Sequence, residues 1–408
     1  MGKVIKIDSL SYKLTFASLF ILTLATFTSL SLSAGSHILI LIPGIYFLTK
    51  KLEYSLPKSS WALLGIFITV IISVLFNLDI IEKPLRHIFK AKYFLFAILW
   101  VISFRKLFID HITKKQIKIL LWVFIIATSL ASLSGLIGLF AGFNPLKMKP
   151  PCHPSRACGV YGMYMTYGYG ISLFVILNIG LLIYRDKIKE YLPLWLIVIS
   201  LVINFMGLYF SYARGGLLAL FVAIPFFYLK NNLKRFLLIL LTGGILLGAS
   251  VLFIPKMNSM FLKRGGSNDQ RISFYQTAVK AFLEKPIYGY GYRNFEPNVT
   301  RLKKKYDIKF ANYGGHAHNN FLEHLASTGF LGALLFILFH IFWFLEIYKR
   351  EDVMAAITLP FIINFSFSGL FQYTFGDGEN LFLILGIYAL SMVKYPMVNL
   401  IPKEVNHG

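Results

Sequence analysis

The sequence predicts a polytopic all-α membrane protein, and three observations favour this class. Of the 408 residues, 57% are hydrophobic and only 14% are charged. The mean hydropathy is +0.66, well above the range of soluble globular domains. Many apolar runs are roughly 17 to 25 residues long, the length that a helix needs to cross the hydrocarbon layer. A β-barrel would instead show alternating polar and apolar residues.

We expect about twelve spans in a single integral membrane domain, residues 1–408. The predicted spans are 14–32, 36–49, 61–77, 88–104, 118–142, 163–184, 192–211, 215–229, 235–254, 326–348, 353–371 and 379–394. The second is short enough to be tilted or re-entrant. The first is interpreted as a retained span, because no small-residue cleavage site marks a signal peptide.

The distribution of Lys and Arg predicts the orientation. These residues gather in alternate connections, among them 50–58, 105–118, 185–189 and 230–235, while the opposite connections are poorer in them. The richer side is expected to face the cytoplasm together with both termini. The connection 255–320 then forms one large outer loop. The basic residues behind the net charge of +23 lie mostly in these short connections. They therefore indicate contact with anionic membrane lipids and not with nucleic acid.

A polar, titratable cluster ends this loop and leads into the apolar run 326–348. The stretch from Gly315 to His324 holds three histidines, two asparagines and one carboxylate. Such groups at the mouth of a membrane helix are costly unless they serve a function. A neutral imidazole accepts a proton from a hydroxyl near neutral pH. We therefore expect His318 to be a general base, with His316 as the second candidate.

A basic residue is predicted at the same outer face, between two spans. A straight helix over residues 192–229 would be about 57 Å long, nearly two hydrocarbon layers, so the chain must turn. Gly215 and Gly216 are expected to allow a tight reversal, which fixes Arg214 at the membrane surface. We interpret Arg214 as an anion-binding residue, with a snorkelling anchor as the alternative.

An amphipathic helix is predicted inside the outer loop. Ser267 and Gln270 fit a capping box, and the helix is expected to stop before Pro286. Its apolar positions are Tyr275, Ala278, Val279 and Phe282. Arg271 in the first turn opposes the helix dipole, which indicates an anionic partner. The alternative is an ordinary exposed arginine.

Two further stretches of the loop are interpreted structurally. Gly289–Arg293 lacks the Gly-Lys-Ser/Thr ending of a nucleotide-binding loop, so a turn is predicted there. The basic run 301–305 is interpreted as a solvated face, with a contact to lipid phosphates or to an anionic acceptor as alternatives.

Two cysteines and two carboxylates lie in other outer connections. Cys152 and Cys158 stand in a Pro-rich loop, which predicts a disulfide; a metal site with His153 and a pair of free thiols are the alternatives. Asp377, close to Glu379, is interpreted as the N-cap of the last span. The alternative is that Asp377 orients the catalytic histidine.

Several of these residues form a pattern that resembles the O-antigen ligase and polymerase family. The matching elements are His318-Asn319 followed by Gly329 and Gly332, the stretch from Ser211 to Gly216, the arginine-led helix after Arg271, and Arg156-Ala157-Cys158-Gly159. The resemblance covers most of the chain in layout. Its motifs are moderately specific for the family and do not choose between its members.

The resemblance implies a glycosyltransferase of the bacterial inner membrane with a periplasmic active site. A glycan on undecaprenyl pyrophosphate would move to an acceptor hydroxyl, so neither a cofactor nor a metal is expected. Arg214, Arg271 and Arg156 would hold the pyrophosphate. The remaining implied roles are general base for His318 and support for Asn319, Asp377 and Glu379.

The short connection before the sixth span favours a ligase, with lipid A–core as the acceptor. The alternative is a polymerase that extends the growing lipid-linked glycan. A transporter or flippase for that glycan is the further alternative. It predicts basic residues distributed through the spans, and the spans of this sequence are nearly free of charge.

Overall fold

The computed structural model describes residues 2–27, 30–50, 56–262 and 265–393. The described chain folds into α-helices joined mostly by short loops. They are α1 Gly2–Leu24, α2 Leu30–Thr49, α3 Lys58–Leu75, α4 Pro84–Lys90, α5 Lys92–Asp110, α6 Lys114–Ala141, α7 Tyr164–Ile183, α8 Arg185–Ile188, α9 Leu194–Ser211, α10 Arg214–Ala223, α11 Leu233–Phe253, α12 Pro255–Phe261, α13 Gly265–Glu284, α14 Phe295–Lys305, α15 Asn320–Tyr348, α16 Val353–Ser368 and α17 Gly378–Ser391. Two 3-10 turns, η1 Ala25–Phe27 and η2 Ile224–Phe227, follow α1 and α10.

Each predicted span has a helical counterpart, although the first two were bounded wrongly. The first helix begins at Gly2 and ends at Leu24, and α2 already begins at Leu30. The second helix is therefore twenty residues long and no short re-entrant segment. Parts of two predicted spans, residues 28–29 and 394, lie outside the described residues.

Seven helices of the described chain are long and apolar enough to cross a membrane, namely α2, α3, α6, α7, α9, α11 and α15. Three shorter apolar helices are α10 with η2, α16 and α17. This content is that of a multi-pass membrane protein. The number twelve stays a prediction.

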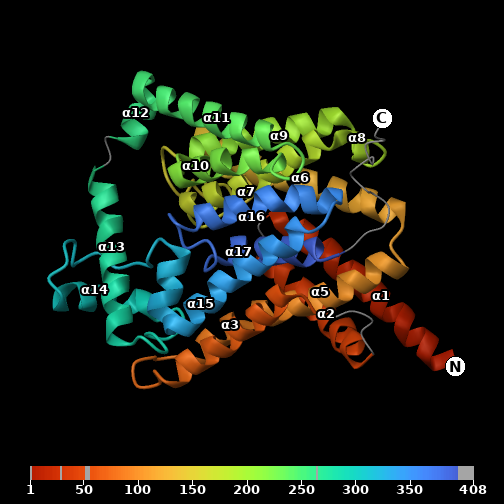
Figure 1. Cartoon of the computed structure of the whole chain (residues 1–408), viewed down its shortest axis with the longest axis horizontal. Coiled ribbons are helices and arrows are strands. Elements are labelled where there is room, and N and C mark those ends of the chain that lie inside the picture. The colour runs from red at the N-terminus through yellow and green to blue at the C-terminus, as the bar shows by residue number, and fades with distance from the viewer. Residues whose placement is uncertain (1, 28–29, 51–55, 263–264, 394–408) are drawn as a thin grey trace.

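The helices pack into one bundle with α7 near its centre (Figure 1). The most extensive helix pairs are α3 with α15, α7 with α9, and α1 with α2. No residue of α11 is buried, and this helix runs along the edge of the bundle. Fully apolar helices with an exposed surface are suited to contact with lipid chains.

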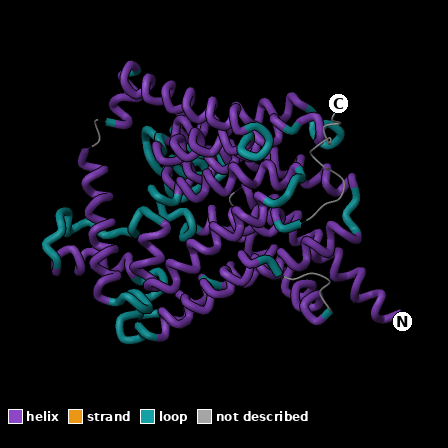
Figure 2. Tube along the Cα trace, viewed as in Figure 1, coloured by secondary structure: helices purple, strands orange, loops and turns teal. Residues whose placement is uncertain are grey.

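The two ends of the bundle differ. The start of α1 and the short α8 lie at one end, whereas α13 and α14 lie at the other, which we name the loop end (Figure 1). The longest non-helical stretches also gather there (Figure 2). This arrangement places residues 185–188 and the outer loop at opposite ends, as the charge pattern predicts. The side of the membrane that each end faces stays a prediction.

The outer loop has a small apolar core of its own. Its buried members are Phe274, Ala278, Ala281, Tyr290, Phe295, Val299, Leu302, Ala317 and Ala326. They come from α13, the α13–α14 connection, α14, the stretch before α15 and the first turns of α15. This core holds the histidine-bearing stretch against the helix bundle.

The helix predicted inside the loop exists as α13, with its start and its buried face displaced. The helix begins at Gly265, so Ser267 is not its cap and Arg271 lies beyond the first turn. The buried face is Phe274, Thr277, Ala278 and Ala281, whereas Val279 is exposed. The helix ends at Glu284, before Pro286, as predicted.

A break in α15 at Gly329 ties the outer loop to the bundle. Gly329 has φ 71° and ψ −167°, a conformation open mainly to glycine. A Cβ at this position would overlap the carbonyl oxygen of Ile287. The backbone groups freed by the break find partners in the loop: Phe330 N donates to Pro286 O (2.8 Å) and Tyr290 N donates to Ala326 O (2.8 Å). Gly329 therefore joins the first turns of α15 to the outer loop.

Candidate active site

His318 lies at the loop end, directly before α15. Its backbone is left-handed, with φ 50°. Its half-buried ring lies against two aromatic neighbours, with centroid distances of 5.3 Å to Phe274 and 4.3 Å to His316. Phe274 belongs to α13, so the amphipathic helix forms one wall of the site.

The imidazole of His318 has a hydrogen-bond partner that the sequence did not reveal. Its Nδ1 lies 2.8 Å from Oε1 of Gln372, a residue of the α16–α17 connection that is fully buried. An amide oxygen only accepts, so Nδ1 carries the proton and donates it to Gln372. The unprotonated Nε2 makes no hydrogen bond within the described residues, which leaves it able to take up a proton.

Two asparagines fix the segment that carries Gln372. Asn319 caps α15 by accepting from the N–H groups of Phe321 and Leu322 (2.9 and 3.0 Å), and its Nδ2 donates to Leu370 O (3.2 Å). Asn320 donates through its backbone N–H to Gly369 O (2.7 Å). The two asparagines thus join the start of α15 to the end of α16.

The side chain of Asn320 extends this connection. Its Nδ2 donates to Thr374 Oγ1 (3.0 Å), and its Oδ1 accepts from Phe375 N (3.1 Å). These contacts fix the residues before Gln372 (369–370) and after it (374–375). Asn319 supports the site as an anchor of this segment.

Asp377 occupies the predicted position at the start of α17 and lies close to Gln372. It occupies the N-cap position of α17, but its side chain makes no capping hydrogen bond. Its Oδ2 accepts from Thr166 Oγ1 of α7 (3.0 Å), and the group that contacts His318 is Gln372. Burial, with a smaller contribution from the nearby charge of Glu379, raises the pKa of Asp377 to about 7.

A buried glutamate, Glu323, and a half-buried arginine, Arg293, lie beside the histidine stretch. Glu323 accepts from Ala317 N through Oε2 (2.8 Å) and from Ser327 Oγ through Oε1 (3.1 Å). Arg293, with φ 59°, donates from Nη1 to Gly376 O (2.7 Å). The sequence interpretation treated Arg293 as part of a turn and missed its role as a cation beside this site.

Both candidate bases are held neutral. Burial, with smaller contributions from the neighbouring His316 and Arg271, lowers the pKa of His318 to about 3. Burial likewise lowers the pKa of His316 to about 4, with a smaller contribution from Arg293. The two rings differ in access, since Nε2 of His316 is buried without a hydrogen-bond partner.

The turn before Arg214 is made by Tyr212 and not by the glycines. Tyr212 adopts φ 54°, and α10 begins at Arg214. Gly215 and Gly216 are helical and buried. A Cβ on Gly215 would overlap the hydroxyl of Tyr169, so this glycine lets α10 approach α7.

Arg214 and Arg271 converge on one face of α13. Nη2 of Arg214 donates to Oδ1 of Asn268 (3.1 Å), and Asn268 is three residues before Arg271, on the same side of the helix. The hydroxyl of Tyr169 lies within the electrostatic reach of both guanidinium groups. Two arginines 57 positions apart in the sequence thus share this region with His318.

Arg156 lies in the connection before α7. Its guanidinium stacks over the ring of Tyr164, 4.3 Å from the centroid. A disulfide joins Cys152 and Cys158 on either side of it. Ala157 N donates to Phe210 O (3.0 Å), which fixes the connection to the end of α9.

The basic run 301–305 is not simply a solvated face. Lys303 is fully buried, with Nζ 3.7 Å from the ring centroid of Phe274, and it donates to Tyr313 O (3.1 Å). Burial lowers its pKa to about 8. Lys305 pairs with Glu284 (2.8 Å). Lys303 therefore packs on Phe274, which in turn contacts His318.

No group of three or more histidine, cysteine, aspartate or glutamate side chains with the spacing of a metal site occurs within the described residues. The polar groups of the site are instead an imidazole, two guanidinium groups and several amides.

Together, the fold and the site define a multi-pass helical membrane protein with a neutral imidazole beside two arginines at one end of its bundle. Residues 199–337, about a third of the chain, match the family model described as O-Antigen ligase. Members of this family are lipid-linked glycan transferases. The matched segment includes Arg214, Arg271 and His318 and ends before Gln372. No curated protein matches the chain in sequence.

Proposed function

We propose that this protein is an O-antigen ligase, a metal-independent glycosyltransferase. It moves a glycan from undecaprenyl pyrophosphate to a hydroxyl of lipid A–core at the periplasmic face of the inner membrane. The observation that carries this proposal is the position of Nε2 of His318, which is unprotonated and has no hydrogen-bond partner among the described residues, in the same region as Arg271 and Arg214.

The proposed reaction is a single displacement at the anomeric carbon. The acceptor oxygen forms a bond to that carbon while the bond to the pyrophosphate oxygen breaks. The acceptor proton passes to Nε2 of His318, and the electron pair of the broken bond stays on the leaving undecaprenyl pyrophosphate. The donor is already activated, so the transfer needs no ATP.

The arginines are suited to the leaving group. A guanidinium forms two parallel hydrogen bonds with phosphate oxygens, and it stabilises negative charge that develops in a site shielded from water. Arg214 and Arg271 approach from different helices, so together they could bind both phosphates. Arg156 contributes charge at the edge of this region. A pyrophosphate there places the lipid tail in the membrane and the glycan outside it.

Ligase activity is favoured over polymerase activity by the compact connection before α7. Residues 142–163 contain a disulfide and a backbone contact to α9, and they form no large second loop. A polymerase that extends the lipid-linked glycan is the alternative.

Deletion of the gene, followed by gel analysis of lipopolysaccharide, tests the choice. A ligase predicts the loss of every capped species. Caps of a single repeat unit would instead identify a polymerase, and an unchanged pattern would contradict both.

A further inference from the structure

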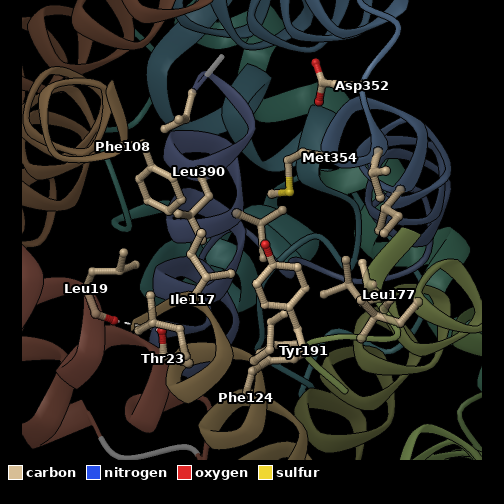
Figure 3. Close-up of a pocket in the computed structure, with 18 residues that line it drawn as sticks. Leu19, Thr23, Phe108, Ile117, Phe124, Leu177, Tyr191, Asp352, Met354 and Leu390 are labelled. Atoms are coloured by element: carbon tan, nitrogen blue, oxygen red, sulfur yellow. Dashed lines mark hydrogen bonds between the residues drawn. The ribbon is translucent and has the colours of Figure 1, made fainter. Parts of the chain in front are cut away.

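An apolar cavity of about 260 Å³ lies at the end of the bundle opposite the loop end. It is formed where α6 and α16 begin and where α7 and α17 end, with α1 and α5 completing its walls. Figure 3 shows side chains of these helices around the space, among them Leu19, Phe124, Leu177 and Leu390. The candidate active site contributes no residue to it.

Most of the wall consists of hydrocarbon side chains, and two of its polar groups have partners of their own. Thr23 donates to Leu19 O (2.8 Å), as the dashed line in Figure 3 marks. Asp352 accepts from Ala355 N (3.0 Å) and from Nε of Arg350 (2.7 Å). Apolar cavities of this size stay dry and take up apolar ligands. The cavity therefore suits a hydrocarbon ligand.

The cavity follows α6 over two turns. Ile117, Leu120, Leu121 and Phe124 line it from one face of this helix, over two turns or about 10 Å. Ile387, Leu390 and Val393 line it in the same way at the end of α17. This shape fits a segment of a linear acyl chain.

The residues at one end of the cavity are flanked by basic side chains. Stretches 114–118 and 185–190, which contribute Ile117 and Ile188 to the wall, hold six basic and two acidic residues. The two acidic residues form the exposed pairs Lys114–Glu190 (3.9 Å) and Arg185–Asp186 (3.6 Å). Such exposed pairs are weak, so the rim keeps an excess of positive charge.

We propose that this cavity binds one acyl chain of an anionic phospholipid, whose phosphate lies against the basic rim formed by residues 114–118 and 185–190. The apolar wall would contact the acyl chain, and the basic rim would favour a headgroup with negative charge. This site is separate from the donor and acceptor sites, so it does not depend on which glycan the enzyme transfers.

Native mass spectrometry of the purified full-length chain tests the site. The protein is delipidated in a non-ionic detergent and titrated with phosphatidylglycerol or with phosphatidylcholine of identical chains. We expect one phosphatidylglycerol to bind at least about fivefold more tightly, because one basic residue near an anionic lipid contributes roughly that factor. Equal affinity for the two lipids would overturn the assignment of the headgroup.

Cavity-filling variants test the location. Leu121→Trp and Met354→Phe fill the cavity from opposite walls and should each abolish the bound lipid while the thermal midpoint without lipid is unchanged or higher. Lys118→Gln should reduce the preference for phosphatidylglycerol about fivefold, whereas Lys349→Gln, at the end of α15, is the matched control and should not. If both filled variants fold and still bind the lipid, the site lies elsewhere. Displacement of the phospholipid by a lower concentration of undecaprenyl phosphate would overturn the proposal in favour of a polyprenyl chain.

Discussion

At the scale of single residues, the neighbouring imidazoles of His316 and His318 differ in the environment of their Nε2 atoms. Within the part of the chain that the structure describes, Nε2 of His318 has no hydrogen-bond partner and Nε2 of His316 is buried. The donor does not need a base in order to bind. We therefore expect His318→Ala to keep donor affinity while transfer falls by about 10² to 10⁴, and His316→Ala to cost far less. Donor binding and transfer, measured separately, check this. If the His316→Ala variant is inactive and the His318→Ala variant is active, the general base is His316 and not His318.

Gln372 gives a second prediction, on the orientation of His318. Gln372→Leu removes the acceptor of the Nδ1 proton, so transfer should fall about tenfold with donor affinity unchanged. Gln372→Glu places a carboxylate beside the imidazole, which raises the pKa of His318 from about 3.

The pH dependence of kcat/KM distinguishes positioning from a structural effect. A base must be neutral, so activity is lost as the pH falls through its pKa. The parent enzyme should lose no activity around pH 6.5 because of His318, whereas the acid limb of Gln372→Glu should move to higher pH. An acid limb in the same place in both enzymes would contradict the positioning role.

Arg214 gives a third prediction. Its proposed contact with pyrophosphate uses the fork of the guanidinium, which lysine cannot reproduce. Arg214→Lys should therefore fail to restore the donor binding that Arg214→Ala loses. Binding of the lipid-linked donor to the two variants decides this. Full recovery by lysine would indicate that only the positive charge matters.

The residues that sequence reasoning found and those it missed differ in a physical way. His318, Arg214 and Arg271 stand out because a polar group beside an apolar run is costly and therefore visible. Gln372 leaves no such signal, because its partner is 54 positions away and its neighbours are those of an ordinary connection. Arg293 was hidden by the glycines around it, which suggested a turn.

At the scale of elements, Gly329 is the position where the outer loop and α15 share a backbone contact. Gly329→Ala forces a left-handed φ on a residue with a Cβ and an overlap with Ile287 O. We expect a loss of about 2 kcal/mol or more in the free energy of unfolding. Gly243→Ala is the matched control, since open space surrounds that glycine in α11. Thermal unfolding in one detergent compares the two, and equal midpoints would contradict the account of the break.

The sequence predicted where helices occur better than where they begin or which side they bury. The displaced face of α13 shows why. Its contacts are with Lys303 of α14 and with the histidine stretch, and packing with distant segments selects Phe274 over Tyr275 and Phe282. The turn at Tyr212 shows the same limit, because the glycines beside it serve helix packing instead.

At the scale of the whole molecule, the disulfide tests the orientation. Disulfides persist on the oxidising side of the membrane. A maleimide should label neither Cys152 nor Cys158 in the purified, unreduced protein. In intact cells, the exposed Cys152 should react with an impermeant maleimide after an impermeant reductant. Lys187→Cys in a cysteine-free background is the control and should react only once the membrane is opened. Labelling of Lys187→Cys from outside would reverse the proposed orientation.

Composition alone was sufficient for the fold class, because a chain with such long apolar runs must bury its backbone hydrogen bonds within helices in the membrane. The assembly of the site could not be predicted, because its parts come from α10, α13, the stretch before α15 and the connection after α16.

The break at Gly329 also bears on biosynthesis, during which the chain enters the membrane from its N-terminus. The first turns of α15 complete their hydrogen bonds with residues 286–291, which are synthesised before α15. Gln372 follows only after α16. A nascent chain that has inserted no further than α15 thus holds His318 without its partner. The acceptor of the Nδ1 proton is therefore supplied only when nearly the whole polypeptide has been made, so the proposed base is oriented late in synthesis.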